Sequence, residues 1–223
     1  MKTSNLAVLA LVSTLIAGCA GMSAPTGPVD IKAETPNLGI EASKKLPLKL
    51  AVVVPDPMGY TMMYYGVKYN PETKKGYSRD MTGAFQSGGY FLERELSKVA
   101  SETFSQAFAQ VVVQRDLPQP GQYDAAVQLN ISKITFNEKV KVSGESSDVT
   151  TEWTLALYDG KNIEILNKKG AAPVHNFSWS VMSPARDHIV AMGPITSQTI
   201  TYLVKEWAEL LYGFEPLRAQ AKR

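Results

Sequence analysis

The two histidines are the residues best suited to acid–base or metal chemistry in this chain. His175 and His188 lie 13 residues apart, which is neither the i, i+4 helical spacing nor the strand spacing that directs two imidazoles at one metal ion. Asp187 precedes His188 and suggests a catalytic dyad, but neighbours in sequence rarely face each other as a dyad requires. We therefore expect a polar loop beside Pro184, with no metal site and no cofactor.

The remaining catalytic motifs are incomplete. The glycine-rich segment 83–89 precedes a predicted helix, but it lacks the Gly-Lys-Ser/Thr ending and the GxGxxG spacing of phosphate-binding loops, so a flexible helix entrance is favoured. No GxSxG nucleophile elbow occurs. Glu138, Glu145 and Asp148 surround Gly144 in the manner of a solvated hairpin, although paired acids distant in sequence remain an open alternative. We expect a protein that is not an enzyme.

Cys19 is the only cysteine, which excludes an internal disulfide framework and a cysteine-rich zinc site. It closes a segment with the layout of a secretory signal, in which Lys2 supplies the positive charge and residues 6–17 form the apolar region. This apolar region is shorter than the roughly 20 residues that a membrane-spanning helix needs. The segment is therefore predicted to be a signal peptide.

The sequence Ile16-Ala17-Gly18-Cys19 resembles the lipobox of bacterial lipoproteins. This resemblance implies cleavage before Cys19, lipidation of its thiol with a diacylglyceryl group, and an acyl chain such as palmitate on its amine. Acyl chains contribute about 0.8 kcal/mol per buried methylene, so two or three chains attach a protein lastingly to a membrane. Ala20 follows in place of the aspartate typical of inner-membrane retention, which implies the outer membrane and a periplasmic orientation.

Composition indicates one globular domain. The chain has 223 residues, is 44% hydrophobic, and carries 23 basic against 21 acidic residues, so it has material for a core but no charge excess for nucleic acid. We predict a signal peptide at 1–18, a lipidated N-terminus and flexible tether at 19–46, a single α+β domain at 47–214 and a frayed basic tail at 215–223.

Hydrophobic periodicity predicts the order β-α-β-β-β-α. We expect two amphipathic helices packed on one face of a four-stranded, largely antiparallel sheet. In strand 123–142 the inward-facing residues change from odd-numbered to even-numbered positions, which predicts a β-bulge near Ser132-Lys133. Trp207 is expected to pack against the sheet beside Trp153 or Trp179. The predicted strands are 48–54, 123–142, 149–158 and 176–181, and the predicted helices are 90–111 and 193–213, the latter beginning at Gly193-Pro194 and ending at Gly213 as its C′ residue.

A run rich in tyrosine and methionine stands out in the segment 58–88, which is otherwise predicted to be irregular. Such side chains supply large, adaptable contacts at binding surfaces. The alternative is that the run packs on the sheet as an extra edge strand. The candidate partner-binding residues are Met58, Tyr60, Met62, Met63, Tyr64, Tyr65 and Tyr69, which Tyr77, Arg79 and Phe85 extend.

The predicted element order resembles that of small envelope lipoproteins of the LptE and YajG type, with strand 48–55 and the helix carrying Phe104 and Phe108 as the closest local similarity. The resemblance implies a non-catalytic accessory or assembly factor that binds a protein or an envelope glycolipid. The balanced charge indicates no nucleic-acid partner. Two alternatives stay open: a lipoprotein that binds a small ligand or saccharide, and a periplasmic hydrolase.

Overall fold

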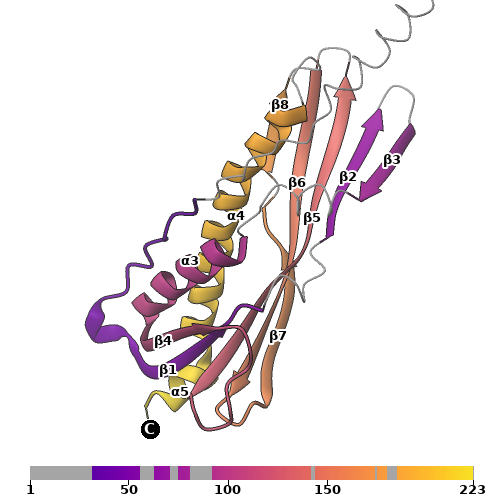
Figure 1. Cartoon of the computed structure of the whole chain (residues 1–223). Helices are drawn as coiled ribbons and strands as arrows, with labels where there is room; N and C mark the ends of the chain where they lie inside the picture. Colours follow the sequence, from indigo (N-terminus) through magenta and orange to yellow (C-terminus); the bar gives the residue numbers. More distant parts are fainter. Residues whose placement is uncertain are drawn as a thin grey trace, which may run out of the picture.

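The computed structural model describes residues 32–55, 63–70, 75–80, 92–141, 144–173, 175–179 and 185–222. Within this part the fold is α+β, as predicted, with the long helices on one side of a single sheet (Figure 1). The strands are β1 (Leu46–Val53), β2 (Met63–Asn70), β3 (Lys75–Asp80), β4 (Phe108–Gln114), β5 (Ala125–Lys141), β6 (Gly144–Asp159), β7 (Glu164–Ala171) and β8 (His175–Trp179). The helices are a 3-10 turn η2 (Ala42–Lys44), α3 (Leu92–Ala107), α4 (Ala185–Gly213) and α5 (Glu215–Gln220).

The two longest strands, β5 and β6, form an antiparallel ribbon that is the spine of the sheet. Each edge of the ribbon takes two strands placed one after the other: β1 and then β2 along β5, and β7 and then β8 along β6. β4 pairs with β1, and β3 pairs with β2. We call the order β4-β1-β5-β6-β7 the core half of the sheet and the order β3-β2-β5-β6-β8 its distal half; the distal half extends away from α3 (Figure 1).

The prediction of a four-stranded, largely antiparallel sheet is therefore wrong in strand number and partly wrong in direction. The described residues form an eight-stranded mixed sheet, in which β1 runs parallel to β4 and to β5, and β2 runs parallel to β5. The predicted strands correspond to β1, β5, β6 and β8. A helix between two adjacent parallel strands is the usual crossover, and α3 occupies this place between β1 and β4.

The first helix is shorter than predicted, because the chain changes from helix to strand between Ala107 and Phe108. Phe104, Phe108 and Val111 keep the helical spacing, so periodicity alone extends the helix too far. The β-branched run Val111–Val113 favours a strand, and pairing with β1 satisfies its backbone.

Two further strand regions contradict the prediction of irregular chain. Residues 63–70 and 75–80 form the β2–β3 hairpin, inside the segment 58–88 that showed no clear pattern. Residues 164–171 form β7, where the sequence suggested only a polar connection. Four of the eight residues of β7, Glu164, Asn167, Lys168 and Lys169, are polar and exposed, so these positions give no hydrophobic pattern in the sequence.

The predicted β-bulge is confirmed. Pairing of β5 with β6 is regular from Ala125 to Ile131, shifts between Ile131 and Lys133, and is regular again to Lys141. The hydroxyl of Ser132, the extra residue, donates to the carbonyl of Glu152 across the ribbon at 3.2 Å. The bulge keeps the apolar residues on one face of the sheet, although they change from odd-numbered to even-numbered positions along the strand.

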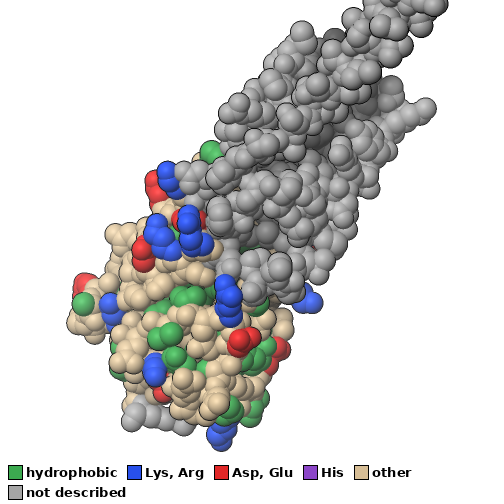
Figure 2. Space-filling model, viewed as in Figure 1, with side chains coloured by type: hydrophobic (Ala, Val, Ile, Leu, Met, Phe, Trp, Pro, Cys, Tyr) green, Lys and Arg blue, Asp and Glu red, His purple; other side chains and the backbone are tan. Residues whose placement is uncertain are grey.

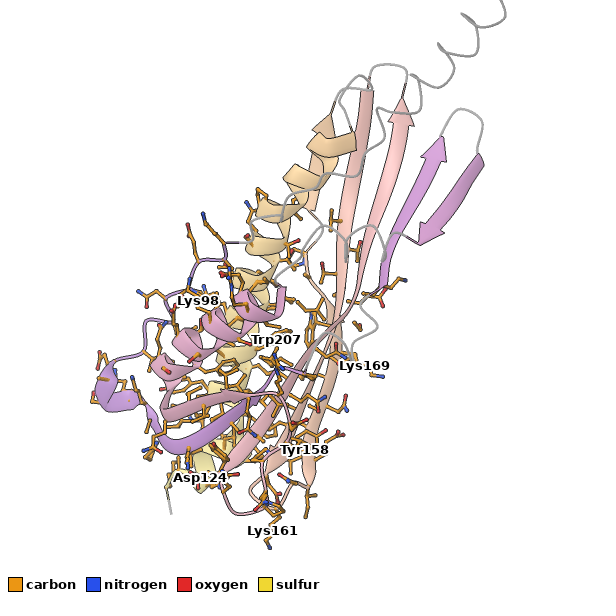
Figure 3. All side chains as sticks on the ribbon, viewed as in Figure 1. Lys98, Asp124, Tyr158, Lys161, Lys169 and Trp207 are labelled. Carbon is orange, nitrogen blue, oxygen red and sulfur yellow. The ribbon has the colours of Figure 1, made fainter. Side chains whose placement is uncertain are left out.

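The hydrophobic core lies between the apolar face of the sheet and the helices. The alternation predicted for β6 is confirmed, since its odd-numbered residues from Val149 to Leu157 are buried. Trp207 of α4 is fully buried and meets Trp153 edge to face at 5.7 Å between ring centroids, as predicted (Figure 3). The largest buried side chains are Trp207, Phe104, Phe108, Leu50, Leu129, Ile131, Leu155, Leu157, Ile200 and Leu203.

Helix α4 begins earlier than predicted. It starts at Ala185 and contains Pro194 in its interior, whereas Gly193-Pro194 was expected to open it. An interior proline removes one helical hydrogen bond, a cost of about 3 kcal/mol that the packing of a long helix can offset. Gly213 is the last residue of α4 and lacks the positive φ of a C′ glycine, because α5 follows almost at once.

Both ends of the described chain are packed, in contrast to the predicted tether and frayed tail. Leu217 of α5 is fully buried, and the side-chain amide of Gln220 donates to the carbonyl of Asp124 at 3.2 Å. At the other end, residues 32–45, which we call the strap, lie along α3 and α4 (Figure 1), with Ala33 buried. The packed domain therefore extends beyond the predicted limits 47–214.

Candidate functional site

The structure describes part of the predicted tyrosine- and methionine-rich site. Cys19, Met58, Tyr60 and Met62, like the glycine-rich segment 83–89, lie outside the described residues. The other four candidates, Met63, Tyr64, Tyr65 and Tyr69, fall on β2. This strand is flanked by β3 and β5, so the run is an additional strand but an interior one, and the expectation of an edge strand is wrong.

Register divides these four residues between the two faces of the sheet. Tyr64 is the partner of Ile134, which in turn is the partner of the buried Thr151, so this row belongs to the face that the helices cover. Tyr65 is the partner of Thr135 and belongs to the opposite face, since successive residues of a strand alternate. We call the helix-covered side the inner face and the other side the outer face.

On the outer face, one strand differs in character from its neighbours. Met63, Tyr65, Val67 and Tyr69 of β2, which we call the aromatic column, occupy successive outer-face positions. The positions beside them on β5 and β6 are polar or charged: Lys133, Thr135, Asn137, Lys139, Glu152, Thr150, Asp148 and Ser146. Among these neighbours, Lys133 forms an ion pair with Glu152 at 3.4 Å, and the Glu152 side chain is half exposed. On the other side, the partners of Tyr65, Val67 and Tyr69 on β3 are Asp80, Ser78 and Gly76. The column thus lies between polar or small neighbours on both sides.

The groups considered for catalysis are dispersed. Asp187 and His188 lie on α4 instead of in the polar loop that was expected. Adjacent helical residues do not face each other, which disfavours a dyad. His175 lies on β8, opposite Val149 of β6. Among the described residues, no group of three or more histidine, cysteine, aspartate or glutamate side chains could hold a metal ion.

A groove of about 620 Å³ lies between the strap and α4. Ser197 and Thr201 of α4 line it, and both bind the strap. Ser197 Oγ accepts from the amide of Lys32 at 2.9 Å. Thr201 Oγ1 accepts from the amide of Glu34 at 3.1 Å and donates to its carbonyl at 2.9 Å. The groove therefore lies at the interface between the strap and α4.

Tyr202 is the aromatic residue of this groove. A hydrogen bond to Glu206, partial desolvation and the negative charge of that carboxylate raise the pKa of the Tyr202 hydroxyl above its ordinary value of 10.0.

The strap also binds α3. The side-chain amide of Gln106 accepts from the amide of Leu38 at 3.0 Å and donates to the carbonyl of Pro36 at 2.9 Å, while Thr35 hydrogen-bonds to Glu102. Sequence reasoning missed this arrangement, because the strap has no periodicity and its bonds come from polar helix residues that normally face water.

The surface charge of the described residues is mixed. Figure 2 shows acidic and basic side chains interspersed over the described part of this face, with small hydrophobic patches between them. No helix in the described part of the chain has both the length and the apolar character of a membrane span.

The comparisons with known proteins give a fold and no family. No protein-family model matches the chain, and no curated protein matches its sequence. The chain is similar to the solved structure of a Helicobacter pylori homolog of the neuraminyllactose-binding hemagglutinin, with a TM-score of 0.50 and 13% identity, over 86% of this chain and 96% of that one. At this identity the likeness shows a shared fold alone.

Two bacterial lipoproteins match less well. The minor lipoprotein of Acinetobacter baumannii has a TM-score of 0.39 at 11% identity, over 74% of this chain and 90% of that one. The uncharacterized lipoprotein B of Nitrosomonas europaea has a TM-score of 0.41 at 11% identity, over 78% and 88%. These TM-scores are too low to support conclusions about this chain.

Proposed function

We propose that this chain is a lipoprotein, anchored through Cys19 in the outer membrane and facing the periplasm, and that it acts as a non-catalytic accessory factor. Its task is to dock another envelope component, a protein or a glycolipid, on the aromatic column. The lipobox-like sequence before Cys19 supports the anchor. The predicted element order that resembled LptE and YajG-type lipoproteins is kept only in part, so the proposal depends on the column itself.

The observation that carries the proposal is the position of the column. A strand that only completed a sheet would carry polar residues on its outer face, as β5 and β6 do beside it. β2 instead places two tyrosines, a methionine and a valine there in succession. Tyrosine and methionine are enriched where proteins bind partners, because they bury much surface and adapt to its shape.

The two faces of β2 provide a matched test. In the full-length protein in native membranes, Tyr65→Ala with Tyr69→Ala removes aromatic rings from the outer face, and Tyr64→Ala removes one from the inner face. We expect the double variant to lose the partner recovered by crosslinking while keeping its melting temperature. Tyr64→Ala should lower the melting temperature and keep the partner in whatever remains folded.

Aromatic anchors commonly contribute 2 kcal/mol or more to binding, which corresponds to about a thirtyfold weakening on truncation. Partner recovery that is equal in the double variant and the unsubstituted protein would contradict a docking role for the column. Loss of stability in both variants, with binding retained, would assign β2 a structural role only.

Saccharide binding is the second candidate, because sugar rings can stack against tyrosine side chains and the similar Helicobacter pylori structure is a homolog of a neuraminyllactose-binding hemagglutinin. Adding sialyllactose to the purified full chain tests it. A saturable rise in melting temperature that disappears in the Tyr65→Ala, Tyr69→Ala variant would favour this function over docking. An unchanged melting temperature would leave docking as the proposal.

A further inference from the structure

Strands at the edges of a sheet expose unpaired backbone groups, and proteins usually protect them with charge or short length. The edge strands here are β4 and β7 in the core half, and β3 and β8 in the distal half. β3 and β7 each carry three charged residues, and β8 has five residues. β4 has seven residues, Phe-Ala-Gln-Val-Val-Val-Gln, with no charge and no proline. It is thus the only one of these four strands without such protection.

The direction of the backbone groups on β4 follows from one hydrogen bond. The carbonyl of Gln114 accepts from the amide of Val54, at 2.9 Å, so the backbone groups of Gln114 face β1. Register with β1 is unbroken from Gln110 to Gln114, and strand residues alternate in the side to which their N–H and C=O groups point. The groups of Ala109, Val111 and Val113 therefore point to the free edge.

Among the described residues, the N–H and C=O groups at these three outward-facing positions have no hydrogen-bond partner. The strand is accessible as well: Ala109 is exposed, and Val112 is 41% exposed. An edge of this length with free backbone groups is suited to pairing with another strand.

We propose that β4 is a self-association edge, through which two copies of the chain pair antiparallel about Val111. In this register Val111 lies opposite its own copy, and Ala109 lies opposite Val113 of the second copy. All three outward positions then form hydrogen-bonded pairs, and each pair exchanges two bonds.

A second copy of the chain is the partner that suits this edge, because β4 can pair with another β4 strand without bringing charges together. Pairing about Val111 places Gln110 opposite Val112 and brings no like charges together, since β4 carries none. A strand from another protein that is charged would gain no ion pair on this edge. The twofold axis also gives a closed dimer, which leaves no further β4 edge open.

Cysteine crosslinking in membranes tests the register. In the full chain, Val111→Cys places two thiols on directly opposed residues about 5.5 Å apart between Cα atoms, within the range that a disulfide spans. Under mild oxidation we expect this variant to shift to twice its mass on a non-reducing gel. The controls are the unsubstituted chain, which reports any contribution of Cys19, and Ile165→Cys, at an exposed position on the charged edge strand β7.

A proline pair tests the same edge without crosslinking. Val111→Pro removes an N–H that faces the free edge, so the fold should persist while the purified protein falls from dimer to monomer mass in sedimentation. Val112→Pro removes an N–H that bonds to β1 and should lower the melting temperature further than Val111→Pro.

Two results would overturn the proposal: a monomeric mass for the unsubstituted full chain, or Val111→Cys crosslinking no better than Ile165→Cys. A Val111→Cys product of any mass other than twice that of the chain would show that another protein pairs with β4, and would also overturn it. Docking at the aromatic column is measured by partner recovery, so failure of either proposal can be recognised separately.

Discussion

Trp207 is the largest fully buried side chain among the described residues and joins α4 to the sheet through Trp153. Truncating a buried aromatic typically costs about 3–5 kcal/mol, a large part of the roughly 5–15 kcal/mol by which domains are stable. We expect Trp207→Ala to lose this much in urea unfolding. Tyr202→Ala, at an exposed aromatic of the same helix, should cost far less, and equal losses in the two variants would contradict the packing described for α4.

The indole of Trp207 also allows a finer test. Its Nε1 is buried and has no hydrogen-bond partner among the described residues. Trp207→Phe keeps an aromatic ring and removes this unpaired donor, so it should retain much of the stability that alanine loses.

Gly170 on β7 is needed because Trp153 lies directly over it. A Cβ at Gly170 would come within 2.6 Å of Cζ2 of Trp153. Gly170→Ala must displace the ring and should destabilise the domain by about 1–3 kcal/mol in thermal or urea unfolding. Gly213→Ala is the matched control, since nothing lies within 4 Å of its Cβ position and its φ is not positive; it should be neutral or slightly stabilising. A loss in the control equal to that at Gly170 would refute the steric explanation.

At the scale of elements, the strap depends on a few hydrogen bonds to α4. Thr201→Val removes both bonds to Glu34 and keeps the side-chain shape, so we expect a loss of about 1 kcal/mol and faster hydrogen exchange at the amides of the strap. Gln198→Ala, at an exposed neighbour on α4, should leave exchange unchanged. If Thr201→Val left exchange of the strap unchanged, the strap would be held by other contacts.

Sequence patterns predicted the elements whose apolar residues alternate or recur strictly. The bulge at Ser132 was predictable because one inserted residue explains why the apolar positions of a buried strand change from odd to even numbers. The burial of Trp207 followed from its place in the apolar stripe of the helix. β4 was missed because Phe108 and Val111 fit a helix as well as a strand. The strap was missed because side chains distant in sequence hold it, and local propensity carries no information on such bonds.

The candidate site was predictable only in part. The composition of residues 58–69 marked it, but the division of Tyr64 and Tyr65 between two faces depends on the register with β5, which is more than sixty residues away in sequence. The sequence also gave no sign that this run would be an interior strand of the distal half.

At the scale of the whole molecule, the strap determines how far Cys19 can lie from the domain. The amide of Lys32 donates a hydrogen bond to Ser197 on α4, and Lys32 lies 13 positions after Cys19 in the sequence. At roughly 3.3–3.6 Å per residue, a fully extended connection reaches at most about 47 Å. A lipid anchor at Cys19 would therefore keep Lys32, and with it Ser197 of α4, within that distance of the membrane surface.

The anchor itself is tested by Cys19→Ala. We expect this substitution to abolish palmitate labelling and to leave an uncleaved or soluble product, because no other residue of the chain can carry the thioether-linked lipid. Labelling that persists at the level of the unsubstituted chain would contradict the lipoprotein assignment.

Docking on the aromatic column is tested most directly by photocrosslinking in living cells. Tyr65 is replaced by benzoylphenylalanine in the full-length protein, and Tyr158 is replaced in a matched control, because it occupies an outer-face position in the core half of the same sheet (Figure 3). We predict a discrete crosslinked partner from position 65 and none of the same mass from position 158. The same product from both positions, or no product from position 65, would contradict a docking function for the column.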